Sequence, residues 1–361
     1  MATPETGFLV IADLTGYTAY LAAGELEHAP TIAGDLLETI VGRLEPPFRL
    51  AKFEGDAAFL WAEDGRADAS LLLDAIEASY VAFRRRLRSI DQATSCACQS
   101  CRLAPRLDLK LFVHHGSYVR TPIAGRDELA GSDVIVVHRL LKGAAVSSGR
   151  ADGFALFTAQ AVDVLGLDPV ALGLARADDS IEHLGQISTF TLDLEARWQA
   201  EAGTRRLDEA GAQPILHLEK VMPADPATVW AYLTSPTLRS RWEGSIRIDE
   251  LGAGGRRGIG TLARCVTGRL ATLEEIVDWQ PYDHVGSRVT VPDVGPVAVA
   301  IDLETVDGGT RVRSRWGYRG PSPVDAAAVR RFRGERGAAF GRLARVLAES
   351  LPVVEPTEVE S

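Results

Sequence analysis

The sequence predicts an α+β protein made of two domains. Its 361 residues exceed what one ordinary hydrophobic core accommodates, so two domains are the first expectation. Strand and helix patterns are mixed in the first half, and the pattern restarts at Ile215 after the polar stretch Ala202–Gln213. The expected divisions are a first domain over residues 1–201, a linker over 202–214, a second domain over 215–351 and a disordered tail over 352–361.

The first half opens with a strand, because residues 8–13 form an apolar run that ends in a polar turn. Residues 28–44 carry apolar side chains at every fourth position, which predicts a helix. Residues 48–62 predict a hairpin that turns near Glu54-Gly55. The other expected elements are a helix over 67–90, a loop over 91–106, strands over 107–115 and 118–122, a helix over 133–142, and strands over 154–158 and 187–194.

The second half repeats this order of strand, helix and sheet. Ile215–Val221 reads as a strand, and Asp225 followed by Pro226 is typical of a helix start, since Asp caps a helix and Pro fits its first turn. Several strands separated by Gly-rich turns are expected over residues 246–316. Residues 325–351 predict one long helix with an apolar face and an arginine-rich face.

The composition excludes some classes of partner. Hydrophobic residues make up 46% and charged residues 24%, which is ordinary for a globular protein. The net charge of −10 gives no electrostatic reason to expect nucleic acid or an anionic membrane as partner. No apolar run approaches the roughly 20 residues of a spanning helix, and the N-terminus lacks the pattern of a signal peptide. We therefore expect a cytoplasmic protein without a membrane span.

Two aspartates lie in similar surroundings. Asp13 ends the first predicted strand beside a Gly-containing turn, and Asp56 follows Gly55 in the predicted hairpin. Carboxylates at such positions are natural ligands of hard cations. Two of them can hold a pair of Mg²⁺ or Mn²⁺ ions that act on the attacking and leaving oxygens of a phosphoryl transfer. The pair therefore predicts a two-metal phosphate site.

Three of the four cysteines, Cys96, Cys98 and Cys101, fall within six residues. In a reducing compartment such a cluster is typical of metal binding or redox chemistry. Zn²⁺ commonly takes four ligands, so one more is needed; an Fe–S cluster, a redox disulfide and unligated thiols are the alternatives. The candidates for a fourth ligand are His114, His115, Cys265, a water molecule and a partner chain.

Four short motifs follow one another in the first half. Their order and separation make residues 8–194 resemble the catalytic domain of class III adenylyl and guanylyl cyclases, which implies a ferredoxin-like α+β fold. The motifs are Ile11-Ala-Asp13-Leu-Thr-Gly16-Tyr-Thr18, Lys52-Phe-Glu-Gly55-Asp56, Val113-His-His-Gly116, and Gly131-Ser-Asp-Val134 followed by Arg139 and Leu140.

The resemblance implies a role for particular side chains. Asp13 and Asp56 would hold two divalent ions. Lys52 stands where ATP-selective members place an adenine-reading lysine, and Glu128 lies near the position of the carboxylate that accompanies it. Arg139 would stabilise the charge that builds on the transferred phosphorus.

It also implies how phosphate is bound and how the chain assembles. The backbone amides of Leu14, Thr15, Gly16, Tyr17 and Thr18 would surround the triphosphate, as turn amides before a helix do. In this family the sites form between two head-to-tail subunits, so the resemblance implies a homodimer.

Two positions depart from the family pattern. The family places an asparagine that orients the ribose where this chain has Ile135, and an aliphatic side chain cannot form that hydrogen bond. The family often carries a Lys-Gly pair before its last strand, whereas this chain has His183-Leu-Gly185. His138 and Lys142 are candidates for replacing a lost group. The pattern suits a weak cyclase, a nucleotide sensor or a variant chemistry.

The second half carries a different resemblance. Its opening strand, the helix with Trp230, the segment ending at Trp242 and the long last helix resemble the START-like superfamily, which includes polyketide cyclase/dehydrase-like proteins. This implies a helix-grip fold, in which an antiparallel sheet wraps around a long C-terminal helix. Such a fold often leaves an apolar cavity between the sheet and the helix. Trp242, Trp279 and Trp316 are candidates for its lining or for plain core. We expect a hydrophobic small molecule as ligand.

Together these patterns predict a signalling protein. A divergent adenylyl cyclase-like domain would bind ATP with Mg²⁺ or Mn²⁺, and a START-like domain would bind a hydrophobic molecule. If active, the first domain would convert ATP to 3′,5′-cyclic AMP and pyrophosphate. Two alternatives stay open: an inactive nucleotide-binding regulator, and a small-molecule or lipid-binding protein whose first half is a dimerisation scaffold.

Overall fold

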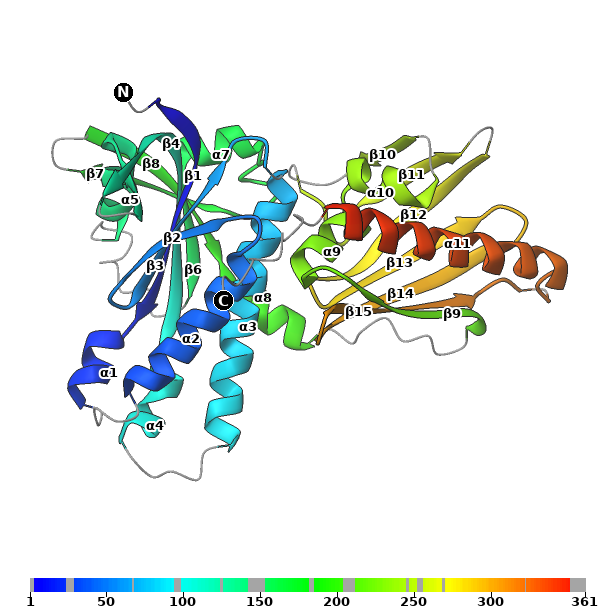
Figure 1. The fold of residues 1–361 in the computed structure, drawn as a ribbon, viewed down its shortest axis with the longest axis horizontal. Helices are drawn as coiled ribbons and strands as arrows, with labels where there is room; N and C mark the ends of the chain where they lie inside the picture. The colour runs from blue at the N-terminus through cyan, green and yellow to red at the C-terminus, as the bar shows by residue number, and fades with distance from the viewer. Residues whose placement is uncertain are drawn as a thin grey trace, which may run out of the picture. The chain divides into compact units, whose positions relative to one another are not determined.

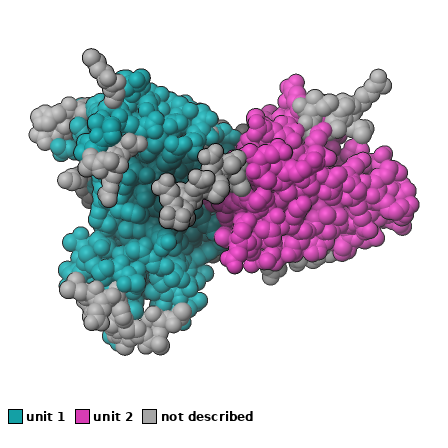
Figure 2. All heavy atoms as spheres, viewed as in Figure 1, with its two compact units in different colours: residues 1–204, 253–256 teal, residues 205–252, 257–361 magenta. Residues whose placement is uncertain are grey.

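The computed structural model divides the chain into two compact units. Unit 1 is residues 1–204 with 253–256, and unit 2 is residues 205–252 with 257–361 (Figure 2). The α+β class expected from the sequence is confirmed, since each unit combines one sheet with helices. The residues that the structure describes are 3–23, 29–66, 68–93, 99–123, 126–141, 153–181, 185–203, 212–244, 247–251, 256–267, 270–321 and 323–350.

The described strands of unit 1 form an eight-stranded sheet around β1 (Figure 1). Strand β1 runs between β3 and β4 and pairs antiparallel with both, and its residues 7–12 are buried. The order is β2-β3-β1-β4-β6-β8-β7, with β5 paired to β4. The strands are β1 (Glu5–Thr15), β2 (Arg49–Glu54), β3 (Ala57–Glu63), β4 (Asp108–Ile123), β5 (Arg126–Ala130), β6 (Phe154–Thr158), β7 (Ala175–Ile181) and β8 (Gly185–Asp193).

Helices pack on this sheet through apolar side chains. In α5, Val134, Val137 and Leu140 join a buried cluster with Leu9 and Ile11 of β1. Helices α2 and α3 pack against each other and contact β3 and β4 respectively. The helices of unit 1 are α1 (Tyr17–Ala23), α2 (Ala29–Leu44), α3 (Ala69–Ala93), α4 (Gln99–Leu103), the short 3₁₀ helix η1 (Ala104–Arg106), α5 (Ser132–Leu140), α7 (Ala159–Leu165) and α8 (Leu194–Gly203).

Gly116 does not separate two strands, as the sequence suggested, but lies inside the continuous strand β4. A Cβ atom at this position would lie 2.4 Å from the side chain of Asp133 in α5, so the glycine allows a close approach rather than a turn. The Asp133 carboxylate accepts a hydrogen bond from the Ser117 amide (2.7 Å) and lies 3.3 Å from His114 Nε2. His114 is buried, and its Nδ1 lies 2.9 Å from the Thr158 hydroxyl.

The expected loop over residues 91–106 is also wrong where it is described. Helix α3 continues to Ala93, and α4 and η1 occupy residues 99–106. Cys101 and Ser100 of α4 are buried. Residues 94–98, with Cys96 and Cys98, lie outside the described residues.

In unit 2, the described strands form a seven-stranded antiparallel sheet of order β10-β11-β12-β13-β14-β15-β9. The long helix α11 lies along this sheet (Figure 1), and its Val329 and Phe332 pack against Val297 and Val299. The elements are β9 (Gln213–Met222), α9 (Pro226–Thr234), α10 (Pro236–Glu243), β10 (Arg247–Leu251), β11 (Leu262–Thr267), β12 (Leu270–Gln280), β13 (His284–Val291), β14 (Gly295–Val306), β15 (Gly309–Tyr318) and α11 (Ala326–Ser350).

Local signals in the sequence explain the helix starts of unit 2. The Asp225 side chain accepts a hydrogen bond from the Thr228 amide (2.9 Å) and caps α9, while Pro226 occupies its first turn. Helix α10 likewise has Pro236 in its first turn and ends at Gly244, whose φ of 86° is left-handed. In the described residues of both units, no helix is long and apolar enough to cross a membrane.

Candidate functional site

The candidate metal site lies on one row of the unit 1 sheet. Asp13 of β1 is paired with Ala57 of β3 on one side and with Lys110 of β4 on the other. Glu54 of β2 is the next partner beyond Ala57. Because directly paired residues point to the same face of a sheet, Glu54, Asp13 and Lys110 share the face that α5 covers. Lys110 is almost fully buried, and its Nζ lies 5.3 Å from the centre of the Phe154 ring.

Asp56 lies in the turn between β2 and β3, next to the end of β1. Its carbonyl oxygen accepts a hydrogen bond from the Leu14 amide (3.1 Å), which ties the turn to the strand that carries Asp13. Burial and the charge of Asp56 raise the pKa of Asp13 to about 6, although the charge of Lys110 opposes this. Among the described residues, neither carboxylate forms an ion pair. The structure therefore brings the two predicted metal ligands together, with a local excess of negative charge.

Strand β1 does not end at Asp13, as the sequence suggested, but continues to Thr15, and the turn follows at Gly16. Gly16 has a φ of 88°, which a residue with a side chain rarely adopts, and α1 begins at Tyr17. The Leu14 amide, which we expected to face phosphate, is already engaged with Asp56. The Thr15 hydroxyl is buried and has no hydrogen-bond partner in the described part of the chain. Buried hydroxyls normally find a partner, so this one is suited to a bound polar group.

A second group of side chains is linked by hydrogen bonds. Lys52 Nζ donates to Glu128 Oε2 (3.0 Å) and lies 3.2 Å from Glu54 Oε1. His138 of α5 joins the group, since its Nε2 lies 3.0 Å from Glu54 Oε2 while its Nδ1 faces the Val134 carbonyl at 2.7 Å. The hydrogen bond to Glu128 is the main cause that raises the pKa of Lys52. The predicted Lys52–Glu128 pair is thus in contact.

The two groups are not adjacent within one chain. Lys52 is paired with Phe59, and Phe59 with Ile11, one row away from Asp13 on the same face. Standard strand spacings place Lys52 and Asp13 on the order of 12 Å apart. Lys52 and Asp13 of one chain are therefore too far apart for direct side-chain contact.

Helix α5 presents the position that departs from the family pattern. Ile135 and Arg139 are four residues apart, so they lie on the same helix face, and both are exposed. Ile135 is 54% exposed, which is high for an isoleucine in a helix that is otherwise well packed. Arg139 forms no ion pair within the described residues. The structure therefore places Arg139 with its guanidinium available and with the aliphatic Ile135 one turn away.

Sequence reasoning missed part of this site. Lys110 belongs to no motif, and Glu54 lies inside the motif of residues 52–56 without a role assigned to it, because the relevance of both depends on the pairing register of β4 and β2 with their neighbours. Strand alternation in residues 107–115 could have put Lys110 on one face, but not opposite Asp13. His138 was named without a place, and the structure gives it Glu54 as partner.

The cysteine prediction stays a prediction, because Cys96 and Cys98 lie outside the described residues. Cys101 is buried in α4 and Cys265 is buried in unit 2, and neither forms a disulfide. Within the described residues, no group of three or more His, Cys, Asp or Glu side chains is arranged to hold a metal ion.

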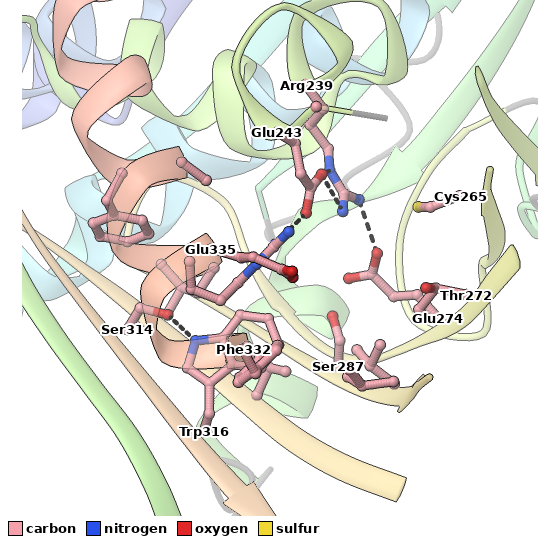
Figure 3. A pocket seen from close by; sticks show the side chains of 18 of the residues that line it. Arg239, Glu243, Cys265, Thr272, Glu274, Ser287, Ser314, Trp316, Phe332 and Glu335 are labelled. Atoms are coloured by element: carbon pink, nitrogen blue, oxygen red, sulfur yellow. Dashed lines mark hydrogen bonds and ion pairs between the residues drawn. The ribbon is translucent and has the colours of Figure 1, made fainter. Parts of the chain in front are cut away.

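Unit 2 contains a cavity of about 540 Å³ (Figure 3). Trp242, Trp279 and Trp316 all contribute to its lining, as do Phe332 and Phe340 of α11. Its size is within the range of small-molecule sites, which are mostly apolar with a few placed polar groups. One wall of this cavity carries a row of linked charged side chains.

That wall carries four charged side chains in alternating order (Figure 3). Glu274 accepts from Arg239 (2.9 Å), Arg239 pairs with Glu243 (2.9 Å), and Glu243 pairs with Arg336 (2.8 Å). Burial alone would raise the pKa of Glu243, but the charges of Arg239 and Arg336 outweigh it and lower that pKa to about 2. The two arginines therefore keep Glu243 ionised inside the unit.

Comparisons with known families and curated proteins cover parts of the chain. Residues 214–348 match the family described as polyketide cyclase / dehydrase and lipid transport. Residues 33–149 match a protein of unknown function, DUF2652. An uncharacterized protein of Mycobacterium tuberculosis is 38% identical over 107 residues, which cover 30% of this chain and 50% of the relative. The chain thus spans half the length of that relative.

Solved structures of two kinds are similar to this chain. The adenylyl cyclase CyaB of P. aeruginosa is 14% identical, with 53% of this chain and 95% of that chain covered and a TM-score of 0.39. Protein MLL2253 of Mesorhizobium loti is 17% identical, with 38% and 98% covered and a TM-score of 0.33. Residues 214–348 therefore match the polyketide cyclase / dehydrase and lipid transport family, as the sequence led us to expect, and adenylyl cyclases are among the proteins of similar structure.

Proposed function

We propose that unit 1 binds ATP with Mg²⁺ or Mn²⁺ at Asp13 and Asp56 and converts it to 3′,5′-cyclic AMP and pyrophosphate. The observation that carries this proposal is the carboxylate pair itself. Burial and the neighbouring charge of Asp56 raise the pKa of Asp13 to about 6, and the charge of Lys110 only partly offsets this rise. Mg²⁺ is commonly held by one or two carboxylates together with substrate phosphates.

We assign roles to Lys52, Glu128 and Arg139 from where their side chains lie. Lys52 and Glu128 offer a donor and an acceptor side by side, which suits the edge of adenine. Arg139 is exposed on α5 with its guanidinium available, which suits the stabilisation of charge on a phosphorus centre. Divalent ions bound at the aspartates would supply charge neutralisation of the phosphates. In the reaction the ribose 3′-oxygen bonds to the α-phosphorus, the bond to pyrophosphate breaks, and the 3′-hydroxyl proton is released.

A homodimer is part of this proposal. Within one chain the Asp13 and Lys52 groups share one face of the sheet but are separated by two strand spacings. A head-to-tail pair of chains would bring the metal ligands of one subunit opposite Lys52 and Arg139 of the other. Each site would then use residues of both chains.

The test is incubation of the full chain with ATP or GTP and Mn²⁺ or Mg²⁺, with products identified by mass spectrometry. Asp13→Asn and Asp56→Asn should abolish cyclic nucleotide formation. Asp35→Asn is the matched control, because Asp35 pairs with Arg86 on the surface, away from the site. Absence of product from the unchanged protein, with metal-dependent ATP binding retained, would reject the enzyme and leave a nucleotide sensor.

That second candidate, a nucleotide-binding regulator without turnover, is favoured by Ile135. Its exposed aliphatic side chain stands one turn from Arg139, where the family uses an asparagine. If the alignment is right, Ile135→Asn should raise turnover or create it, while Ile135→Ala should not. A chain that binds no nucleotide at all would instead support the scaffold alternative.

We propose that unit 2 binds a hydrophobic small molecule. The support is the cavity of about 540 Å³ with its aromatic lining, together with the family match over residues 214–348. Such a ligand would make unit 2 the sensing part of a signalling protein.

A further inference from the structure

We infer that the unit 2 cavity selects an uncharged aromatic ligand carrying a hydroxyl group, such as a phenol, and rejects carboxylates of the same shape. This inference rests on the proposed ligand-binding role of unit 2 and specifies its ligand class. It is carried by three features of the cavity: its charge balance, its unpaired polar atoms and its aromatic surfaces.

The charged side chains in the lining are balanced. They comprise four arginines and four carboxylates, and the inner wall alone holds two of each in the order Glu274, Arg239, Glu243, Arg336. Side-chain exposure in this wall is 11% for Arg239 and Glu243, 14% for Glu274 and 21% for Arg336. On the inner wall neither Arg239 nor Arg336 is left over to pair with an anionic ligand; Arg342, elsewhere in the lining, donates its Nε to the Trp242 carbonyl oxygen (2.8 Å). A carboxylate bound here would be desolvated without an added counter-charge, which is costly.

Uncommitted polar atoms line the same wall. Glu274 is held by Arg239 through Oε2, and the structure gives its other oxygen no partner among the described residues. The Ser287 hydroxyl, from a buried residue, has no hydrogen bond in the described part of the chain and points toward the open space near Glu274 (Figure 3). The Nε of Arg336 is buried without an acceptor in that part of the chain. A ligand hydroxyl can donate to the carboxylate and accept from Ser287, whereas a carboxylate cannot donate.

Aromatic rings stand beside these polar atoms. The Arg336 guanidinium lies 5.8 Å from the centre of the Trp316 ring and 6.0 Å from that of Phe332. Trp316 and Phe332 are in edge contact at 5.1 Å, and Trp316 is fixed by a hydrogen bond from its Nε1 to Ser314 (2.7 Å). Fixed rings favour a flat aromatic partner over a flexible chain, since a flexible chain loses more conformational entropy on binding.

Three probes of one shape test the inference on the full chain at pH 7: naphthalene, 2-naphthol and 2-naphthoate, with dissociation constants from titration calorimetry. We expect 2-naphthol to bind about tenfold more tightly than 2-naphthoate, a difference of about 1.4 kcal/mol. Equal binding or a preference for the carboxylate would overturn the inference while leaving a ligand-binding unit 2. Failure of all three probes to bind would overturn both.

Glu274→Gln removes one negative charge from the wall with little change of shape. It should leave the cavity cationic and shift the preference toward 2-naphthoate by about tenfold or more. Glu275→Gln is the matched control, because adjacent strand residues point to opposite faces and Glu275 faces Arg288 at 3.6 Å outside the cavity. An unchanged preference in Glu274→Gln would contradict the inference.

Ser287→Ala provides a second route if Glu274→Gln does not fold. This substitution should weaken the binding of 2-naphthol by roughly two- to tenfold, which corresponds to the loss of one hydrogen bond, and should leave the binding of naphthalene unchanged. If the binding of both probes weakens equally, Ser287 acts only through packing, and the proposed hydrogen bond between its hydroxyl and the ligand is contradicted.

Discussion

At the scale of one residue, Asp13 is a side chain whose charge lowers the stability of the fold at neutral pH. Its pKa is raised from 3.8 to about 6 by burial and by the charge of Asp56. At neutral pH the folded chain therefore carries an ionised carboxylate that the unfolded chain holds at lower cost. Such residues are typical of functional sites, where activity is retained at the expense of stability.

We predict that Asp13→Asn stabilises the metal-free protein at pH 7 by about 1 to 2 kcal/mol, a few degrees in the melting temperature. A carboxyl whose folded-state pKa is raised stabilises the fold below pH 3.8 and loses that contribution as the pH rises through about 6. The Asp13→Asn variant does not lose this contribution, so the difference in unfolding free energy between the variant and the unchanged chain should grow from pH 3.8 to about pH 6. Thermal unfolding at several pH values with a chelator present checks it, and a variant less stable than the unchanged chain at pH 7 would contradict it.

Lys52 gives a second prediction at this scale. Its contacts with Glu128 and Glu54 are partly exposed, so Lys52→Gln should change stability by no more than about 0.5 kcal/mol. Under the proposed function the same variant should weaken ATP binding about tenfold or more, since the donor to the base is lost. Parallel denaturation and nucleotide titration separate the two effects, and intact ATP binding would remove Lys52 from the site.

At the scale of elements, α5 has two faces with separate tasks. Leu140 is almost fully buried against the sheet, and Ile135 is exposed beside Arg139. The buried face fixes the position from which His138 reaches Glu54. The exposed face carries the groups assigned to the nucleotide.

We therefore predict opposite outcomes for two truncations in α5. Leu140→Ala should cost about 2 to 5 kcal/mol of unfolding free energy, the usual cost of a cavity in a core. Ile135→Ala should stay within about 0.5 kcal/mol, because its side chain makes little buried contact. Urea denaturation of both variants measures this, and a large loss for Ile135→Ala would show that its face is covered.

Elements also mark where sequence reasoning succeeded and failed. Strand β1, the β2–β3 hairpin, α2 and α11 follow from periodicity and turn residues, so their approximate positions were predictable. The break that we expected between two strands at Gly116 was wrong. The glycine leaves space for the Asp133 side chain of α5, a contact between distant segments that no local sequence pattern shows. The five-residue helix α4 is too short to show a period. Lys110 became a site residue only through the register of β4 with β1.

At the scale of the molecule, each unit has its own sheet and its own buried cluster. We predict that calorimetric unfolding resolves two transitions, because each core can unfold by itself. ATP with Mn²⁺ should raise the melting temperature of one transition, and 2-naphthol that of the other. At a ligand concentration one hundred times the dissociation constant, the unit that binds the ligand should gain about 2.7 kcal/mol of unfolding free energy. Asp13→Asn and Phe332→Ala should each move a different transition, and one shared transition that both ligands raise would contradict the prediction.

Under the proposed function, the raised pKa of Asp13 has a further consequence for metal binding. Below about pH 6 the carboxyl is mostly protonated, so an arriving cation has to displace a proton. Uptake of manganese in weakly buffered solution would then be accompanied by acidification, and the number of protons released per ion would fall as the starting pH rises. Acid would act on such a site as a competitive inhibitor, without any change in the fold.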